Sequence, residues 1–507
     1  MRWIVRLGVA LMVASMVAVE AARGAPTTAE IRTPPAPPTP RINGATVFGV
    51  RPGHPFLFHI AATGERPMTF QADGLPDGLR LDAQTGEITG VVKDPGEHEV
   101  MLHATNAKGT ATRSFKIVVG ETIALTPPMG WNSWNHYATR VTQAIVLANA
   151  KAMAASGLID HGWTYVNIDD SWQGQRGGAF HAIQGNAKFP DLGALCREVH
   201  ALGLKVGIYS TPWVQSYAGY AGGSAVDESG AFAKSTEPSK GRLNQKMLPW
   251  SIGPYSFARN DARQWATWGM DYLKYDWNPV EAPATREMAT ALRESGRDIV
   301  LSLSNSTPYA NIPVLCTLAN SWRIGGDIKA NWQRMTDEAL NDELWRPYAS
   351  PGHWNDPDML EIGTREKGQP GLTPDEEYTH MTWWCLLSAP LLLGNDLTKM
   401  DAFTLNLLTN DEVLAVDQDA KGEQAAPVAR DGDRLVYAKH LADGSLAVGL
   451  FNLGTAPARV SVTWSDLKLD GTHAVRDLWR QKDLGAFRDG FGLEVAPHSA
   501  ELVKVGR

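Results

Sequence analysis

The chain has little cysteine: three residues, Cys196, Cys316 and Cys385, among 507. An odd, scattered set neither suits a disulfide framework nor has the spacing of a metal cluster. We therefore expect buried thiols. The stability of the protein must then come from its hydrophobic cores.

Long apolar runs are also absent beyond the N-terminus. Leu7–Val19 is apolar but too short to span a bilayer, and Arg2 and Arg6 precede it. This pattern predicts a signal peptide over residues 1–25. The mature bacterial protein would be exported, periplasmic or extracellular, and free of the membrane after cleavage. A retained membrane anchor is the alternative, which the short run disfavours.

The sequence lacks an excess of positive charge, since its net charge is −8. It therefore gives no reason to expect a nucleic acid partner. It also lacks a His-Glu-x-x-His pair and a Walker loop, so we expect neither a metal nor a cofactor. Tryptophan, by contrast, is abundant, with 18 residues. Its faces stack on the apolar faces of sugars, which favours a carbohydrate ligand, although large cores also use this residue.

Changes in composition divide the rest of the chain into four segments. Residues 26–41 are rich in proline and predict a stiff linker. Residues 42–120 alternate short apolar runs with turn signals and predict a small β-sandwich. Within it, the stretch 74–90 resembles Ig-like modules found beside bacterial glycan enzymes. We expect a spacer or packing module, with sugar binding as the alternative. Residues 121–414 alternate strands and helices, and residues 415–507 predict a second β-sandwich that packs on them.

In the third segment, eight apolar runs alternate with stretches of helical spacing. Eight strand-then-helix units predict a (β/α)8 TIM barrel. A doubly wound open sheet is the alternative, but such a sheet more often has a glycine-rich phosphate turn after its first strand, and this chain has none there. The runs are Met129–Trp134, Tyr165–Asp170, Lys205–Thr211, Asp271–Trp277, Ile299–Asn305, Ser321–Asp327, His353–Leu360 and Leu391–Asp396.

Polar side chains gather where these runs end. In TIM barrels the carboxyl ends of the strands form the active face. A purely structural barrel has no reason to crowd carboxylates there, because like charges destabilise the fold unless a ligand, lysine or arginine compensates. The residues are Asp169, Asp170, Tyr209, Asp276, Asn305, Asp327 and Asp358.

Two of these carboxylates suggest glycosidic bond cleavage, which needs a nucleophile and a proton donor. Asp276 ends its run, and Lys274 lies on the same side of the strand. We expect the Lys274 ammonium to hold the pKa of Asp276 low, although a simple buried ion pair is the alternative. Asp327 follows Arg323 and a Gly-Gly pair. As an acid/base it needs a pKa raised by burial and by the Asp276 charge, and a helix cap is the alternative role.

The connection after the third run is long, from about residue 213 to residue 255. A long loop in a compact domain is usually functional or disordered, and its place on the active face favours a loop that covers substrate. Its aromatic residues are Trp213, Tyr217, Tyr220, Trp250 and Tyr255.

Six motifs follow one another in order over roughly residues 122–420. They are Pro127–Trp134, Asn167–Trp172, Gly207–Tyr209, Leu273–Asp276, Trp322–Arg323 with Asp327, and Gly352–Leu360. Together they resemble glycoside hydrolase family 27, the family of α-galactosidases and α-N-acetylgalactosaminidases. The resemblance implies a barrel followed by a C-terminal sandwich, and a retaining hydrolase that removes terminal α-D-galactosyl residues from oligosaccharides or polysaccharides.

The resemblance also implies a role for each site residue. Asp276 would be the nucleophile and Asp327 the acid/base, with carboxyls about 5–5.5 Å apart. The implied substrate contacts are Trp134 stacking on the sugar, Asp169 and Asp170 accepting from the 6- and 4-hydroxyls, Lys274 at the 3- and 4-hydroxyls, Arg323 at the 2- and 3-positions, and Tyr209 and Asp358 lining the pocket. Asp358 equally suits a supporting turn at the barrel rim.

Two positions bear on the sugar itself. Family members that favour β-L-arabinopyranosides replace the aspartate near carbon 6, so Asp169 argues for a full hexose. Ser304 stands where α-galactosidases often have a glutamate, and α-N-acetylgalactosaminidases have serine there. We rank galactose first, because losing one contact opens a pocket without creating affinity for an acetamide. A non-catalytic sugar-binding protein would be expected to lose one carboxylate. A surface adhesion protein would leave the strand-end carboxylates unexplained.

Overall fold

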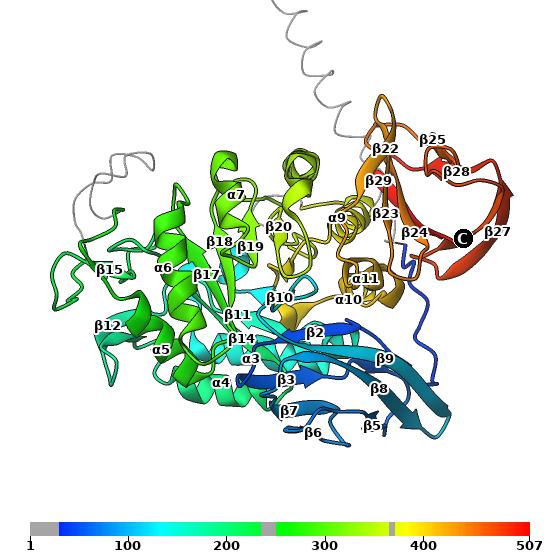
Figure 1. The fold of residues 1–507 in the computed structure, drawn as a ribbon. Coiled ribbons are helices and arrows are strands. Elements are labelled where there is room, and N and C mark those ends of the chain that lie inside the picture. Colours follow the sequence, from blue (N-terminus) through cyan, green and yellow to red (C-terminus); the bar gives the residue numbers. More distant parts are fainter. Residues whose placement is uncertain (1–29, 235–249, 365–370, 507) are drawn as a thin grey trace, which may run out of the picture.

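The computed structural model describes residues 30–234, 250–364 and 371–506. Figure 1 shows an N-terminal β module in blue, a central barrel from cyan to yellow and a C-terminal β-sandwich from orange to red. The predicted signal peptide lies outside the described residues. Within them, no helix has the length and apolarity needed to cross a bilayer.

The centre of the molecule is a sheet of eight parallel strands in the order β20-β19-β18-β17-β14-β11-β10-β21. A parallel bridge between Leu360 and Leu393 joins its two ends. The predicted TIM barrel is therefore confirmed, and each strand lies inside one predicted run. The strands are β10 (Met129–Asn132), β11 (Tyr165–Asn167), β14 (Lys205–Ser210), β17 (Tyr272–Asp276), β18 (Val300–Ser304), β19 (Ser321–Arg323), β20 (Trp354–Asp356) and β21 (Leu391–Leu393).

The strands are buried on both faces, as parallel strands covered by helices must be, which explains their continuous apolar runs. All six residues of β14, for example, are buried. The helices are α2 (Trp134–Tyr137), α3 (Gln143–Ala155), α4 (Leu192–His200), α5 (Ala258–Trp268), α6 (Ala282–Arg293), α7 (Ile312–Leu315), α8 (Trp332–Asn341), α9 (Pro374–Leu387), α10 (Ala402–Leu408) and α11 (Asp411–Asp417).

Helix starts follow local capping rules. Thr142 caps α3 and Asp191 caps α4 by accepting a hydrogen bond from a backbone N–H of the first turn. At α9, Thr373 and Glu376 form a reciprocal capping box.

The N-terminal module is a sandwich of two main sheets, β2-β9-β8-β5 and β3-β7-β6, around its own core. It covers the amino ends of the barrel strands, the end opposite the predicted active face (Figure 1). Asp298, just before β18, binds Arg51 at 3.0 Å and His54 at 2.9 Å. The module therefore packs against the barrel. The strands are β1 (Arg41–Ile42), β2 (Val47–Val50), β3 (Pro55–His59), β4 (Ala62–Thr63), β5 (Thr69–Asp73), β6 (Leu79–Leu81), β7 (Glu87–Val91), β8 (Gly96–Asn106) and β9 (Gly109–Val119).

The C-terminal sandwich has a six-stranded sheet, β22-β23-β24-β29-β26-β27, and a pair, β25-β28. Trp479 donates to Thr382 of α9 at 2.9 Å, and the Trp383 and Phe451 rings lie 4.5 Å apart. The sandwich therefore packs on the barrel, as predicted. Its strands are β22 (Ala426–Asp431), β23 (Arg434–His440), β24 (Leu446–Asn452), β25 (Ala458–Thr463), β26 (Thr472–Asp477), β27 (Lys482–Arg488), β28 (Gly490–Val495) and β29 (Ser499–Val505).

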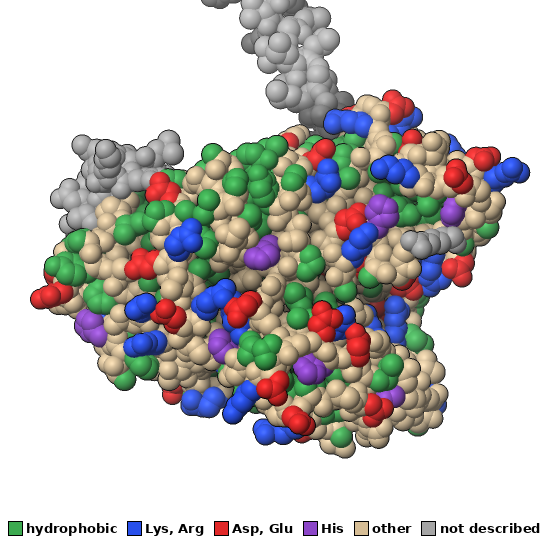
Figure 2. Space-filling model, viewed as in Figure 1, with side chains coloured by type: hydrophobic (Ala, Val, Ile, Leu, Met, Phe, Trp, Pro, Cys, Tyr) green, Lys and Arg blue, Asp and Glu red, His purple; other side chains and the backbone are tan. Residues whose placement is uncertain are grey.

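The proline-rich segment connects helix α9 of the barrel with the N-terminal module. Arg32 pairs with Asp375 at 2.7 Å and lies over the Tyr378 ring, so the segment contacts α9 at this residue. From there the chain crosses to the module (Figure 1). On the face shown in Figure 2, acidic and basic side chains are interspersed over the module and the adjoining barrel.

Candidate active site

A cavity of about 780 Å³ lies at the carboxyl ends of the barrel strands. The structure brings all ten predicted site residues to this one cavity: Trp134, Asp169, Asp170, Tyr209, Lys274, Asp276, Ser304, Arg323, Asp327 and Asp358. They come from six strands or the loops that follow them, and from the first residue of α2. The barrel topology alone therefore assembles the site.

Asp276 is the last residue of β17 and is only 7% exposed. Its Oδ1 accepts a hydrogen bond from Asn305 Nδ2 at 3.1 Å. Burial raises the pKa of Asp276 above its usual value, while Lys274 and Asn305 lower it without cancelling that effect. The prediction that Lys274 keeps this pKa low is therefore wrong, because desolvation outweighs the attraction of the ammonium.

Lys274 has a different direct partner. Its Nζ lies 2.8 Å from Asp169 Oδ2, in a pair that joins β17 to the end of β11. Burial opposes the charge on Lys274, but Asp169 and Asp276 raise its pKa above the usual value. The ammonium therefore pairs with Asp169 and stays protonated.

Asp170 holds the long loop that follows β14. Its Oδ1 accepts from Ser216 Oγ at 2.8 Å, and its Oδ2 accepts from the backbone N–H of Ala218 at 2.9 Å. Burial raises the pKa of Asp170 to about 6, although these hydrogen bonds lower it. Two further donors use Oδ1, the N–H of Ser171 and Nε2 of Gln173. A carboxylate has about four lone-pair sites, two on each oxygen. Three donors therefore share Oδ1, while Oδ2 accepts from the N–H of Ala218.

Asp327 differs from its prediction in two respects. β19 ends at Arg323, so Asp327 stands in the following loop rather than at a strand end. Its side chain is 70% exposed, so the expected burial is wrong. The Gly-Gly pair does permit a close approach, because a Cβ on Gly325 would lie 2.0 Å from Glu338 Oε2 of α8.

Arg323 joins the loop to the next strand. Its Nη2 lies 2.8 Å from Asp358 Oδ2 and 3.5 Å from Asp327 Oδ1. The same Asp358 oxygen accepts from the backbone N–H of Ile328 at 2.7 Å. Asp358 therefore holds both Arg323 and the residue after Asp327, which agrees with a supporting role at the rim.

The remaining predicted residues complete the walls. Ser304 is the last residue of β18 and is 3% exposed. The hydroxyl of Tyr209, near the end of β14, is buried and has no hydrogen-bond partner among the described residues. Trp134 opens α2 and is half-buried. Each of these residues lines the cavity.

Part of the long loop reaches the cavity. Tyr217 lines it, and its hydroxyl accepts a hydrogen bond from Asn305 Nδ2 at 3.0 Å. The Tyr217 ring packs against Trp213 and Trp250, with centroids 5.0 and 6.1 Å away. The sequence reasoning missed Asn135 and Glu361, which line the cavity and form a hydrogen bond. Glu361 directly follows the seventh predicted run, His353–Leu360. A carboxylate at the end of a run could have marked it as a site residue.

The family described as alpha galactosidase A matches residues 126–235 and 244–419. The chain belongs to this family. The resemblance to glycoside hydrolase family 27 is thereby confirmed, and the chain is a glycoside hydrolase. A second family match, to the alpha galactosidase C-terminal beta sandwich domain, covers residues 431–505, and a match to an Ig domain family covers residues 39–120.

Matches to known alpha-galactosidases and solved structures extend over most of this chain. Alpha-galactosidase 2 of Arabidopsis thaliana is 36% identical over 400 residues, which are 77% of this chain and 92% of the relative. A solved structure from Bacteroides fragilis is 31% identical, has a TM-score of 0.83, and covers 95% of this chain and 100% of its own. Alpha-galactosidase I of Mortierella vinacea is 32% identical, has a TM-score of 0.64, and covers 75% of this chain and 97% of its own.

Proposed function

We propose that this hydrolase is an exported, retaining exo-α-galactosidase that removes terminal α-D-galactosyl residues from oligosaccharides or polysaccharides. The observation that supports the proposal most is the single cavity that gathers Asp276, Asp327 and the eight predicted sugar-binding residues. The relatives named alpha-galactosidases support the choice of sugar.

In the first step, Asp276 attacks the anomeric carbon and forms a glycosyl ester. The bond to the leaving oxygen breaks, and Asp327 gives that oxygen its proton. In the second step, Asp327 takes a proton from water, and the water oxygen attacks the same carbon. The ester bond then breaks, releasing the Asp276 carboxylate and galactose with the α-configuration retained.

The electrostatics of the cavity suit this sequence. Burial raises the pKa of Asp276, and the Asp169 and Asp327 charges add to this effect. Asp276 must be ionised to attack, and its raised pKa requires a higher pH for ionisation. Asp327 lines the same cavity, and its exposure gives the departing oxygen and the attacking water access to its carboxyl.

The polar groups around Asp169 favour a hexose. Lys274 and Asp169 form a fixed donor–acceptor pair in the cavity, next to Asp170. We propose that the 4- and 6-hydroxyls of galactose bind here, and that an arabinopyranoside would leave one partner unused. Such an unused buried polar group lowers affinity for the wrong sugar.

Hydrolysis of two aryl glycosides tests the sugar. We expect the mature protein to prefer aryl α-D-galactoside over aryl α-N-acetylgalactosaminide in kcat/KM. Ser304 leaves room beside the 2-position, but the lining supplies no assigned partner for an acetamide. Preference for the acetamido sugar would instead make the chain an α-N-acetylgalactosaminidase, the second candidate that Ser304 supports. Activity on neither substrate would contradict both.

Asn305 is proposed to position the nucleophile, because its carboxamide donates to both Asp276 and Tyr217. Its φ is 70°, in the left-handed region that glycine also adopts without strain. Asn305→Gly therefore removes the carboxamide while preserving the backbone. We expect kcat to fall roughly tenfold to a hundredfold, the scale of a hydrogen bond to a charged group.

The pH profile separates this role from a merely structural one. The Asn305 hydrogen bond lowers the pKa of Asp276, so its loss will raise that pKa further. The acid limb of kcat/KM will then move to higher pH. Ser306→Ala is the matched control, since Ser306 lines the same cavity beside Asn305. An unshifted acid limb in Asn305→Gly would refute the positioning role.

A further inference from the structure

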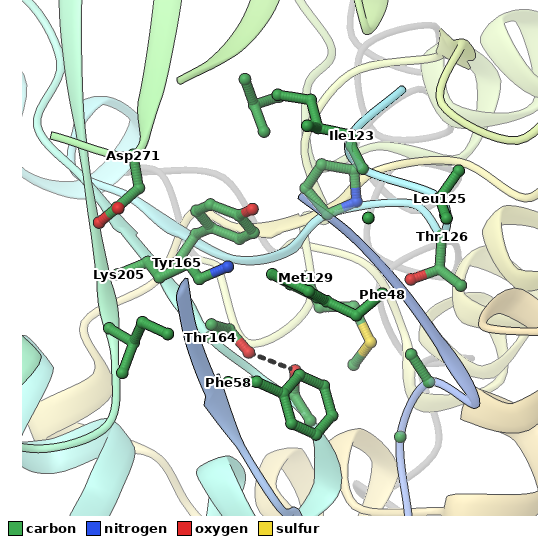
Figure 3. A pocket seen from close by; sticks show the side chains of 18 of the residues that line it. Phe48, Phe58, Ile123, Leu125, Thr126, Met129, Thr164, Tyr165, Lys205 and Asp271 are labelled. Atoms are coloured by element: carbon green, nitrogen blue, oxygen red, sulfur yellow. Dashed lines mark hydrogen bonds between the residues drawn. The ribbon is translucent and has the colours of Figure 1, made fainter. Parts of the chain in front are cut away.

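A second cavity, of about 110 Å³, lies between the N-terminal module and the floor of the barrel (Figure 3). Phe48 and Phe58 line it from the module, and Ile123 and Leu125 line it from the connecting segment. Met129, Tyr165 and Lys205 line it from the barrel, and they are the first residues of β10, β11 and β14. The cavity is therefore at the opposite end of the strands from the active site.

Lys205 places a buried amine in this cavity. The residue is only 9% exposed, and its Nζ lies 4.3 Å from the Phe48 ring centroid and 5.5 Å from that of Tyr165. In Figure 3 the nitrogen points between these rings into the open space. Among the described residues, no oxygen accepts a hydrogen bond from this amine and no carboxylate forms an ion pair with it.

The two nearby carboxylates are already committed to other partners. Asp271 accepts from His200 at 2.8 Å and from Arg297 at 2.6 Å. Asp298 accepts from Arg51 and His54 of the module. Arg297 balances the charge of Asp271, and Arg51 balances that of Asp298. The positive charge of Lys205 therefore has no carboxylate of its own among the described residues. The partners of the Lys205 ammonium are then the Phe48 and Tyr165 ring faces, and an anion in the cavity would attract it more strongly than these rings do.

The rest of the lining limits the kind of anion. Phe48, Ile123, Leu125 and Met129 form an apolar part of the lining that suits a short hydrocarbon group, while Asp271, Arg297 and Asp298 line the polar part beside Lys205. An apolar cavity of roughly 150 Å³ holds a benzene molecule, so this smaller one suits a ligand of about five heavy atoms. His59 also lines the cavity, and neither of its ring nitrogens has a hydrogen-bond partner among the residues that the structure describes, which leaves a second potential donor.

We propose that this cavity binds a compact organic monocarboxylate, with the carboxylate on Lys205 and a short apolar tail against Phe48 and Met129. The site is independent of the proposed glycosidase activity, since it shares no lining residue with the active site. It makes the junction between module and barrel a ligand-binding surface rather than a passive contact.

Titration of the full chain with propionate tests the proposal, and propionamide is the neutral control of the same shape. We expect saturable propionate binding in the millimolar range, at least about tenfold weaker binding of propionamide, and a similar loss for propionate in Lys205→Met. Hydrolysis of aryl α-D-galactoside by Lys205→Met should be unchanged. No propionate binding at about 50 mM, equal binding by Lys205→Met, or displacement by galactose would each overturn the site.

A second readout needs no variant. Burial lowers the pKa of the Lys205 amine to about 8, while Asp271 and Asp298 raise it and Arg297 lowers it. Tyr165 and His59 are the other titratable groups that line the cavity. A bound carboxylate favours the ammonium, so propionate binding near about pH 8.5 should take up protons and should weaken as the pH rises. Calorimetry in two buffers of different ionisation enthalpy measures this uptake, and binding without it would overturn the assignment to Lys205.

Discussion

Asp276→Ala will reduce turnover of aryl α-D-galactoside by about 10⁴-fold or more, the scale seen when a catalytic nucleophile is removed. Without the carboxylate no glycosyl ester forms, and water has no equivalent route to the anomeric carbon. The side chain is buried at the end of β17, so no neighbouring carboxylate can take its place without rearranging the strand. Rates near those of the wild type would exclude Asp276 as the nucleophile.

The fold of this variant should survive. Burial raises the pKa of Asp276, which means that the folded state disfavours its charge relative to the unfolded chain. A carboxyl with a raised folded-state pKa lowers stability at pH values above that pKa. Removing it should therefore leave the Tm at neutral pH equal or higher, as often happens when an active-site group is deleted. A large loss of Tm would make the activity result uninformative, and the more conservative Asp276→Asn would then replace the alanine variant.

Azide can separate loss of the nucleophile from general damage to the site. In Asp276→Ala the missing carboxylate leaves space beside the anomeric carbon. Azide entering that space attacks the carbon, and the phenolate of an activated aryl galactoside leaves. The product is a β-galactosyl azide, with the configuration inverted because only one displacement has occurred. Wild-type enzyme would instead give α-galactose by two displacements, so product configuration by NMR distinguishes the two routes.

The sequence predicts most of this site because its information is local to each strand. A parallel strand covered by helices needs a continuous apolar run, and the eight runs located all eight strands. The barrel topology then brings the strand ends together, so residues as distant in sequence as Trp134 and Asp358 were expected in one cavity and lie there. Neither the positions of the strands nor the gathering of their ends required knowledge of a side-chain contact.

Two predictions were wrong, the low pKa of Asp276 and the burial of Asp327, because both depend on groups that are distant in the sequence. Lys274 and Asp276 share a strand face, but the closest carboxylate to the Lys274 amine is Asp169, on another strand. Which effect dominates the pKa of Asp276 depends on how completely the folded barrel excludes water, and a residue pattern does not specify this. Likewise, the pattern of residues 321–327 does not show that β19 stops at Arg323 and leaves Asp327 in an exposed loop.

Asp327→Ala will affect substrates according to their leaving groups. An alkyl α-galactoside needs a proton on its departing oxygen, so its kcat/KM should fall about 10²- to 10⁴-fold, the usual contribution of a general acid. A dinitrophenyl galactoside leaves as a stable anion, so its kcat/KM should change much less. Asp337→Ala is the matched control, since Asp337 is another exposed carboxylate, on nearby α8. An equal fall for both substrates would argue that Asp327 only maintains the shape of the site.

Hydrolysis of the glycosyl ester, the second step, provides an independent test of Asp327. Asp327 must also take a proton from the attacking water, so its loss slows hydrolysis of the glycosyl ester whatever the first leaving group was. With the dinitrophenyl substrate, formation of the ester then outpaces its breakdown. The variant should release a burst of phenol equal to the enzyme concentration, and its KM should fall because the ester accumulates. Asp358 and Arg334 hold the Asp327 loop through backbone groups rather than the deleted carboxylate. Asp358 accepts from the N–H of Ile328 at 2.7 Å, and Arg334 donates to the Asp327 carbonyl at 3.1 Å. The loop should therefore keep its position, and a burst without a change in Tm would assign both proton transfers to one exposed carboxyl.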